Sequence, residues 1–225
     1  MEASIALPGS VMAVAGTPRG EGSVVAGGRL LRAGEFEWRV PVSGTVYGVI
    51  LNDRPTWEAW GPAMAQAPYQ APPRAPVLFV KPRNTHAASG ARVPMPAGTA
   101  ALDIGAQLGI LFARTATRVS EAEALDTVAG YVPVIDLSIP HATIHRPAIR
   151  EKCFDGACPI GPGVVPRAQA GDPAVLLLRT RVDGALVAER RLDDLLRPVA
   201  RLVAEVSAFM SLLPGDLLLA GAPLA

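Results

Sequence analysis

The sequence predicts an α+β protein in which β-structure dominates, a mixed β-sandwich or roll with a few short helices. Short apolar or alternating runs, bounded by Gly, Pro, Asp or Asn, recur along the 225 residues and are typical of strands. Helix signals are few. Strands and helices do not alternate regularly, which argues against a doubly wound parallel sheet.

The first part of the chain carries three of these elements after a weakly patterned start. Residues 1–28 are rich in Gly, Ala, Ser and Val without clear periodicity, and we expect a loosely ordered, flexible N-terminal tail there, with the folded domain spanning 29–225. Alternation predicts strands at 29–40 and 45–51, and a helix is expected at 55–66, because Pro55 is acceptable at a first helical position.

The middle of the chain continues this strand-rich pattern. A proline-rich loop leads into a strand at 77–80, and the apolar run at 108–113 reads as a buried strand. Ser120 followed by Glu123 forms a capping box, which predicts a helix from Glu121 to about Val128. Residues 131–137 are expected to form the next strand.

The C-terminal part predicts a hairpin, a helix and a last strand. Asp183-Gly184 is a strong two-residue turn signal between strands at 175–182 and 185–189. Asp193 or Asp194 can cap a helix that reaches about Leu213, and a strand at 217–220 follows.

Composition excludes several classes of protein. Half of the residues are hydrophobic, 18% are charged and the net charge is +1, so no basic face argues for nucleic acid. Apolar runs fall far short of a membrane helix, and the N-terminus lacks the basic region of a secretory signal. Cys153 and Cys158 are expected to be free thiols in a reducing compartment. These features predict a cytoplasmic protein with no membrane or nucleic-acid partner.

Several motifs appear in an ordered series from about residue 30 onward. They are LFVKPRNT (78–85), VAGYVPVIDLS (128–138), KCFDGACPIGP (152–162) and LLPGDLLLAGAP (212–223). Together they resemble the fumarylacetoacetate hydrolase superfamily, although each is weak alone. Against that resemblance, the domain is expected to lack the C-terminal hairpin that usually follows the last motif.

A narrower resemblance is to the N-terminal repeat, or separate N-terminal subunit, of the homoprotocatechuate (4-hydroxyphenylacetate) degradation bifunctional isomerase/decarboxylase. It is carried by LNDRPTWEAW (51–60) and HRPAIREKCFDGACPIG (145–161). The resemblance implies decarboxylation of an oxopentene tricarboxylate, isomerisation of a hydroxyheptadiene dioate, and a divalent metal, Mg²⁺ or Mn²⁺. Of the two repeats, only the C-terminal one carries the usual metal-binding acids.

The resemblance also implies a degenerate metal site. Asp136 matches the third acidic ligand, while Gly105 and Gln107 replace the two expected glutamates. Glycine has no ligand to offer and glutamine is a weaker, neutral oxygen donor, so we do not expect tight binding of Mg²⁺. Lys152 and Asp155 remain as a relic of the catalytic pocket, where they could form a buried ion pair or bind an anion.

Other positions depart from the family's pattern as well. Thr56 stands where the family has an acid/base histidine, and Ala220-Gly221-Ala222 replaces Thr-Gly-Thr. His86, His141 and His145 are interpreted as surface or supporting residues, because Pro140 and Pro147 disfavour a helix that would bring the last two together.

Three functions stay open at this point. The chain could be a structural subunit that pairs with a catalytic paralogue of the same fold, or that forms a homodimer. It could be an independently active enzyme on a small keto-diacid. It could also be a metal-free ligand-binding module.

Overall fold

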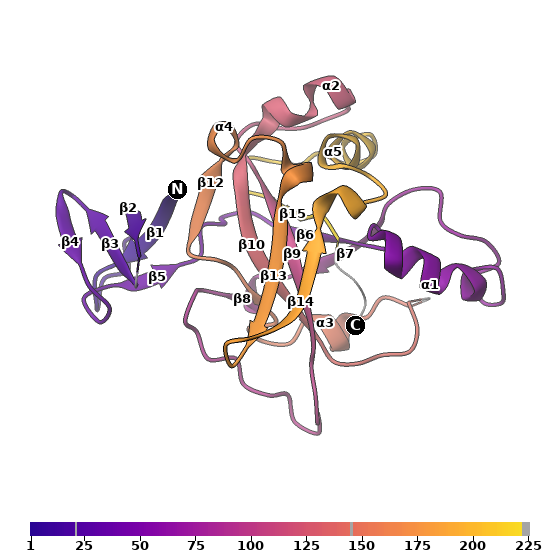
Figure 1. The fold of residues 1–225 in the computed structure, drawn as a ribbon, viewed down its shortest axis with the longest axis horizontal. Coiled ribbons are helices and arrows are strands. Elements are labelled where there is room, and N and C mark those ends of the chain that lie inside the picture. The colour runs from indigo at the N-terminus through magenta and orange to yellow at the C-terminus, as the bar shows by residue number, and fades with distance from the viewer. Residues whose placement is uncertain (21, 145, 222–225) are drawn as a thin grey trace.

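The computed structural model describes residues 1–20, 22–144 and 146–221, and it confirms the β-rich α+β class (Figure 1). The strands, in chain order, are β1 (Glu2–Ala6), β2 (Val14–Arg19), β3 (Ser23–Ala26), β4 (Arg29–Leu31), β5 (Glu37–Arg39), β6 (Val46–Ile50), β7 (Val77–Lys81), β8 (His86–Ala87), β9 (Asp103–Phe112), β10 (Val128–Ser138), β11 (Cys158–Pro159), β12 (Gly163–Pro166), β13 (Leu177–Val182), β14 (Ala185–Arg191) and β15 (Leu217–Leu219).

The helices are short. They are α1 (Arg54–Met64), α2 (Glu121–Ala124), α3 (Ile149–Lys152), α4 (Arg167–Ala170) and α5 (Val199–Ser207), with single 3₁₀ turns at Arg83–Thr85, Leu125–Thr127, Pro173–Val175 and Leu192–Asp194. Within the described residues, no helix is long and apolar enough to cross a membrane.

The main sheet runs in the order β4-β3-β2-β1-β12-β10-β9-β15-β6-β7, and β5 pairs with β1. Its centre is the antiparallel pair β9–β10, in which Asp136 lies opposite Gly105 and Val134 lies opposite Gln107. Since side chains alternate between the faces of a sheet, these four positions share one face. The register of β9 and β10 thus places the predicted ligand positions Gly105, Gln107 and Asp136 on the same face of the sheet.

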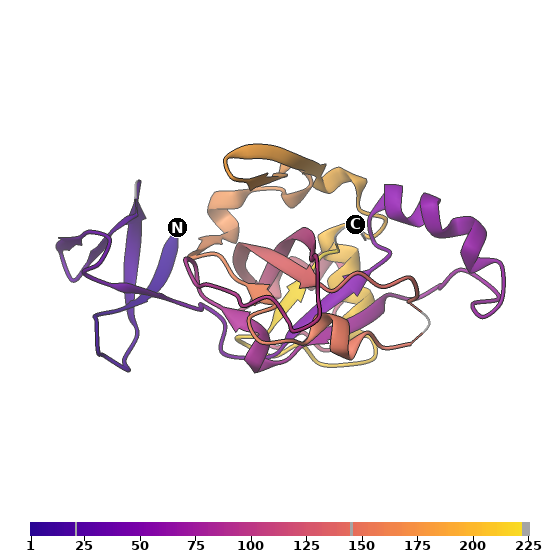
Figure 2. The same cartoon turned by 90° about the horizontal axis from the view of Figure 1, so that it is seen from below.

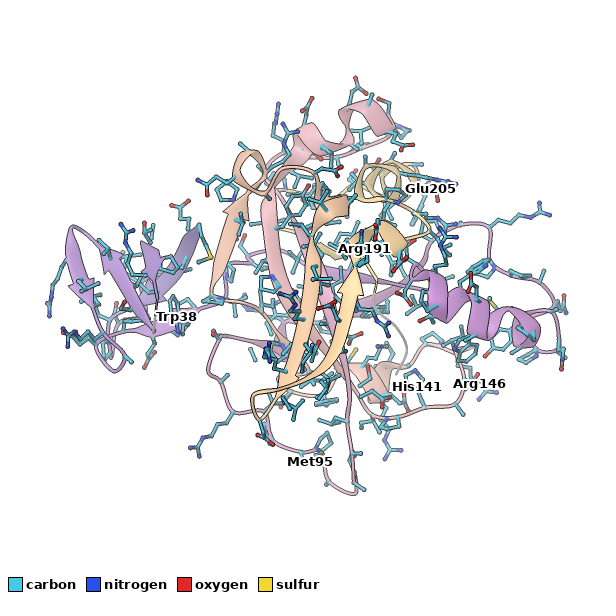
Figure 3. The ribbon with its side chains drawn as sticks, viewed as in Figure 1. Trp38, Met95, His141, Arg146, Arg191 and Glu205 are labelled. Carbon is cyan, nitrogen blue, oxygen red and sulfur yellow. The ribbon has the colours of Figure 1, made fainter. Side chains whose placement is uncertain are left out.

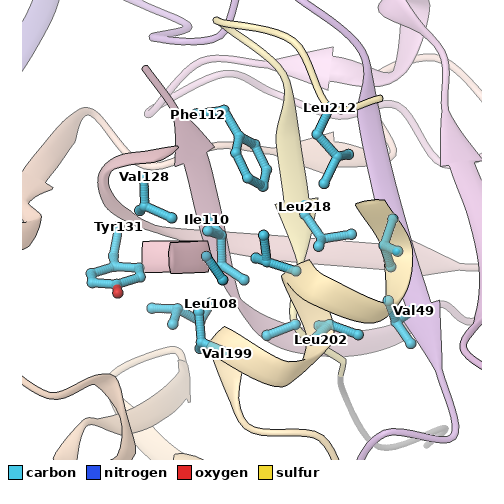
Figure 4. Packing of buried hydrophobic residues seen from close by; sticks show 14 of the residues in the cluster. Val49, Leu108, Ile110, Phe112, Val128, Tyr131, Val199, Leu202, Leu212 and Leu218 are labelled. Atoms are coloured by element: carbon cyan, nitrogen blue, oxygen red, sulfur yellow. The ribbon is translucent and has the colours of Figure 1, made fainter. Parts of the chain in front are cut away.

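Each face of the central strands is buried against a separate core. On one face, Leu108, Ile110 and Phe112 pack with Leu218 and with α5 (Figure 4). On the other, Val132, Val134, Leu217 and Leu219 pack with Ile160. Burial on both sides explains why these strands read as continuous apolar runs rather than as alternating ones.

The β13–β14 hairpin forms a separate two-stranded ribbon on one side of the main sheet (Figure 2). Its turn is Asp183-Gly184, and both residues have positive φ, +50° and +81°. These angles match the primed turn that the dipeptide predicted.

The N-terminal region corrects one prediction. Residues 1–28, expected to form a flexible tail, instead carry β1, β2 and β3, which together with β4 and β5 make a small lobe (Figure 1). The lobe has its own core of Ile5, Val24, Leu31 and Phe36. The small residues of these strands alternate too weakly to predict them, and β1 pairs with the distant β12.

Two predicted boundaries also move. The expected strand at 29–40 is interrupted by a turn at Gly34 (φ +93°), where the Glu35 carboxylate accepts the Arg32 N–H. The last helix begins only at Val199, because the residue before a proline is disfavoured in helical conformation and Pro198 closes off the preceding turn. The capping box at Ser120 and Glu123 is present as predicted.

Candidate functional site

Asp136, on β10, is the one member of the predicted metal-binding triad that offers a carboxylate, and it is held between two lysines. Lys152 Nζ, at the end of α3, donates to Asp136 Oδ2 over 2.7 Å. Lys81 Nζ, at the end of β7, lies 2.6 Å from Oδ1. All three side chains are buried, with exposed fractions of 0% for Lys81 and 6% for the other two.

The Lys81 ammonium is surrounded by oxygen. Its three N–H groups donate to the carbonyls of Leu137, Lys152 and Ala157 over 2.9, 2.7 and 3.0 Å. Asp136 Oδ1 therefore receives an ionic contact without an aligned hydrogen bond. Burial lowers the pKa of Lys81 and the Asp136 charge opposes that shift. Only the charged ammonium of Lys81 has three N–H groups to donate to three carbonyls, so this geometry belongs to the charged form of Lys81.

Gln107, on β9, completes the cluster. Its Nε2 donates to Asp136 Oδ2 over 3.2 Å, and its Oε1 accepts the Gly221 N–H over 3.1 Å. The amide oxygen is therefore already engaged by the chain and turned away from Asp136. Gly105, opposite Asp136, has no side chain to contribute.

A divalent metal does not fit these residues. Each carboxylate oxygen of Asp136 already has a cation within 2.7 Å, and a metal ion would have to displace a lysine or sit beside two like charges. Mg²⁺ prefers several oxygen ligands, including carboxylates. In the part of the chain that the structure describes, no group of three or more His, Cys, Asp or Glu side chains could hold a metal.

Lys152 is positioned by two further contacts. It donates to Ser138 Oγ over 2.7 Å, and its Nζ lies 4.6 Å from the centre of the Phe79 ring. The ring lies against Gly48 on the neighbouring strand, where a Cβ would come within 2.1 Å of it. Gly48 thus leaves room for the aromatic surface that faces the ammonium.

Asp155 does not join this cluster. It is exposed and accepts a hydrogen bond from Asn84 Nδ2 over 2.8 Å, so the ion pair considered between Lys152 and Asp155 is not formed. Lys152 uses Asp136 instead.

The remaining predicted positions take structural roles. Thr56 donates to Asp53 Oδ1, the side chain that caps α1. His86 Nε2 lies 3.0 Å from the Lys81 carbonyl, and burial lowers the pKa of His86. His141 Nδ1 lies 3.0 Å from the Ile139 carbonyl. Ala220 is buried in the core that contains α5. His145 and Ala222 lie outside the described residues, and so does the segment to which the prediction of a missing hairpin refers.

The two cysteines are free, as predicted, and they differ in environment. Burial raises the pKa of the Cys158 thiol to about 12. The folded chain therefore keeps this proton while the unfolded thiol ionises near pH 8.5, so stability is expected to fall as pH rises from about 9 towards 12. The loss is at most about 1.4 kcal/mol per pH unit.

This prediction is checked by urea unfolding of the wild type and the Cys158→Ala variant between pH 8 and 11. The variant should show the shallower loss of stability over that range. Equal pH slopes for the two proteins would contradict it. Burial also raises the pKa of Cys153, which is partly exposed, and the Cys153→Ala variant is the comparison that should change the slope less than Cys158→Ala does.

With the geometry described, the chain can be placed among known proteins. It belongs to the fumarylacetoacetate (FAA) hydrolase C-terminal family, whose model matches residues 45–225. Two relatives illustrate the range. The 4-hydroxyphenylacetate degradation bifunctional isomerase/decarboxylase of Escherichia coli is 39% identical over 182 residues, which make up 81% of this chain and 41% of the relative. The mitochondrial oxaloacetate tautomerase of Rattus norvegicus is 33% identical over 153 residues, or 66% of this chain and 69% of the relative.

Solved structures share the fold over nearly the whole chain. A 5-carboxymethyl-2-hydroxymuconate delta-isomerase from Mycobacterium smegmatis superposes with a TM-score of 0.78 at 27% identity, covering 99% of this chain and 87% of that one. A 2-hydroxyhepta-2,4-diene-1,7-dioate isomerase from Mycobacterium marinum gives 0.76 at 27% identity, covering 99% and 86%. A fumarylpyruvate hydrolase from Pseudomonas aeruginosa in complex with Mn²⁺ and pyruvate has the same fold, with a TM-score of 0.68 at 23% identity over 99% of this chain and 84% of that one.

Proposed function

We propose that this chain is an N-terminal-type subunit of a cytoplasmic 4-hydroxyphenylacetate-pathway isomerase/decarboxylase, with a degenerate metal site. In this role it pairs with a catalytic paralogue of the same fold and supports that paralogue's active site. The paralogue carries the complete carboxylate site and performs the decarboxylation and isomerisation, and this chain alone has little or no activity.

One observation carries the proposal: Gly105 and Gln107 offer Asp136 no second carboxylate, and within the described residues the only cations in contact with Asp136 are Lys81 and Lys152. The ammonium groups of Lys81 and Lys152 lie against the two carboxylate oxygens of Asp136, where a catalytic metal ion and its substrate would have to bind. The protein thus keeps the family's fold, while the one carboxylate left in the metal-binding triad is paired with two lysines of the same chain.

The length of the relatives supports a paired arrangement. This chain spans about four-tenths of the E. coli isomerase/decarboxylase that it matches, which leaves room in that relative for a second domain of similar size. A second copy of the fold, fused or separate, is the partner that such an arrangement implies.

The experiment that tests the proposal combines calorimetry and activity. Mg²⁺ or Mn²⁺ is titrated into the purified chain, and decarboxylation and isomerisation are assayed with and without the paralogue. We expect no metal binding and no turnover by the chain alone, and higher activity in the mixture than with the paralogue alone. The Gly105→Glu, Gln107→Glu double variant, which restores both carboxylates, is the matched comparison and should bind metal more tightly than the wild type.

An independently active enzyme on a small keto-diacid is the competing function. Tight metal binding and turnover by the isolated chain, abolished by Asp136→Ala, would establish that function and reject the structural subunit. A mixture no more active than the paralogue alone would also reject the structural subunit.

A further inference from the structure

A groove of about 510 Å³ runs along one edge of the β13–β14 hairpin, which lies on one side of the main sheet (Figure 2). Four consecutive residues of β13, from Leu178 to Arg181, line the groove, whereas no residue of β14 does. The rest of the lining includes residues 88–91, Ala106 of β9 and Ile135 of β10. The groove therefore lies along the edge of β13 that β14 does not cover.

The backbone of β13 has hydrogen-bond partners on one side only. Within the described residues β13 pairs with β14 alone, and no other backbone hydrogen bond involves residues 177–182. An unpaired strand edge is a template for a further strand, because its N–H and C=O groups point outward in a row. The four residues that line the groove would span about 13 Å of such an edge.

The outer edge of β14 is less suited to strand addition. The register of the hairpin shifts after Thr180, which lies opposite Ala188. The next pair is Arg181 and Leu186, so Val187 is an extra residue in β14. A bulge of this kind bends the strand and disrupts regular pairing along its edge. β13 has no extra residue, and its edge is the one that adjoins the groove.

The side chains of β13 predict the pattern of a strand that would lie beside it. Leu178 and Thr180 are half-buried, whereas Arg179 and Arg181 are exposed. Ile135, in the same groove, is an apolar side chain that remains 37% exposed. Because side chains alternate along a strand, every second side chain of an added strand would meet this apolar surface, and the others would lie beside the arginines.

The charge of the groove favours an acidic partner. Arg179 and Arg181 line it, and no Asp or Glu does. Arg179 is paired with Glu189, but Arg181 takes part in none of the ion pairs found among the described residues. Arg191, at the end of β14 (Figure 3), is paired with Asp193. A second copy of β13 laid antiparallel along this edge would bring arginine next to arginine, which disfavours a homodimer there.

We propose that this groove binds an extended segment of a partner protein in which acidic and apolar side chains alternate, by adding that segment to β13 as a further strand. The acidic side chains bind the two arginines, and the apolar ones contact Ile135 and Leu178. In this mode of recognition, main-chain hydrogen bonds supply affinity and alternate side chains supply specificity. The proposal goes beyond the proposed function, because neither Lys81 nor Lys152 lines the groove.

Fluorescence anisotropy with labelled peptides and the purified chain tests this surface. The probe is the peptide Ser-Val-Glu-Val-Glu-Val-Ser, and the matched control has lysine in place of both glutamates. We expect saturable binding of one glutamate peptide per chain and at least about tenfold weaker binding of the lysine peptide. No saturable binding, or equal binding of the two peptides, would overturn the proposal.

Two N-methylated forms of the glutamate peptide test strand pairing. The N–H groups of successive residues in a strand point to opposite edges, so only one set of them can face β13. Methylation at the three valines removes one set, and methylation at the two glutamates removes the other. One methylated peptide should keep most of the affinity, and the other should lose at least about tenfold. Equal affinities of the two methylated peptides would exclude addition to β13.

Two arginine variants of the chain locate the site. Arg181→Gln is expected to weaken the binding of the glutamate peptide by about threefold, the effect of one exposed ion pair. Arg191→Gln removes an exposed arginine of β14 that does not line the groove, and it should leave the affinity unchanged. Equal effects of the two variants would show that the peptide binds elsewhere.

These outcomes are independent of the proposed function. Peptide binding is measured on the isolated chain without metal, so it would stand even if the paralogue gained nothing from the mixture. A peptide affinity that falls as the protein concentration rises would assign the groove to a second copy of this chain and would overturn the acidic partner.

Discussion

Replacing Lys81 by Met is expected to lower the free energy of unfolding by about 3–5 kcal/mol. The variant would leave Asp136 with one of its two cationic partners, and it would remove the shared donor of two buried carbonyls and one partly buried carbonyl. An unsatisfied buried acceptor costs about 1–3 kcal/mol, so even partial relaxation of the chain leaves a large effect. Urea unfolding followed by circular dichroism measures it.

Arg83→Met is the matched control, because Arg83 is exposed two residues further along the same segment. Its effect should stay within about 0.5 kcal/mol. If Lys81→Met lost less than about 1 kcal/mol, the Lys81 ammonium would not be what holds the three carbonyls together.

The second large effect is expected in the core against α5. Leu218, on the central strand β15, is fully buried and packs with Ile110, Phe112 and Leu202 (Figure 4). Truncation to Ala removes its contacts and leaves a cavity between the sheet and the helix. The expected loss of stability is about 2–5 kcal/mol, measured by chemical unfolding.

Two substitutions bracket this result. Leu218→Met preserves the volume and should cost less than about 1.5 kcal/mol. Leu213→Ala changes a half-exposed leucine five residues earlier and should have a small effect. A Leu218→Ala variant as stable as Leu213→Ala would contradict the burial of Leu218 between β15 and α5.

The strands that could be predicted are those with a local signal. Residues 177–191 gave the hairpin because Asp183-Gly184 favours one turn type, and the apolar run before Phe112 marked β9. The N-terminal lobe could not be predicted in the same way. Its strands are short and rich in small residues, and β1 is held in part by pairing with β12, about 160 residues away.

The site was predicted in part. Asp136 and Lys152 were identified from motifs and lie together, but Asp155, predicted from the same motif as Lys152, lies apart from them. Lys81 was not proposed as a site residue. A signal for it was present, because the chain has only two lysines among its 21 basic residues and both lie in the family motifs. The structure brings both to one carboxylate, a convergence that depends on how β7 and α3 meet in space.

The oxygens around Lys81 come from three separate stretches of chain, at Leu137, Lys152 and Ala157. A tetrahedral ammonium can direct its hydrogens at three such points, whereas the planar fork of an arginine is suited to two acceptors side by side. All basic residues of the chain other than Lys81 and Lys152 are arginines, so lysine at position 81 is explained by the geometry of its three acceptors. A single nitrogen atom at the end of an edge strand guides the path of the backbone from 137 to 157, and along that path Lys152 comes within reach of Asp136.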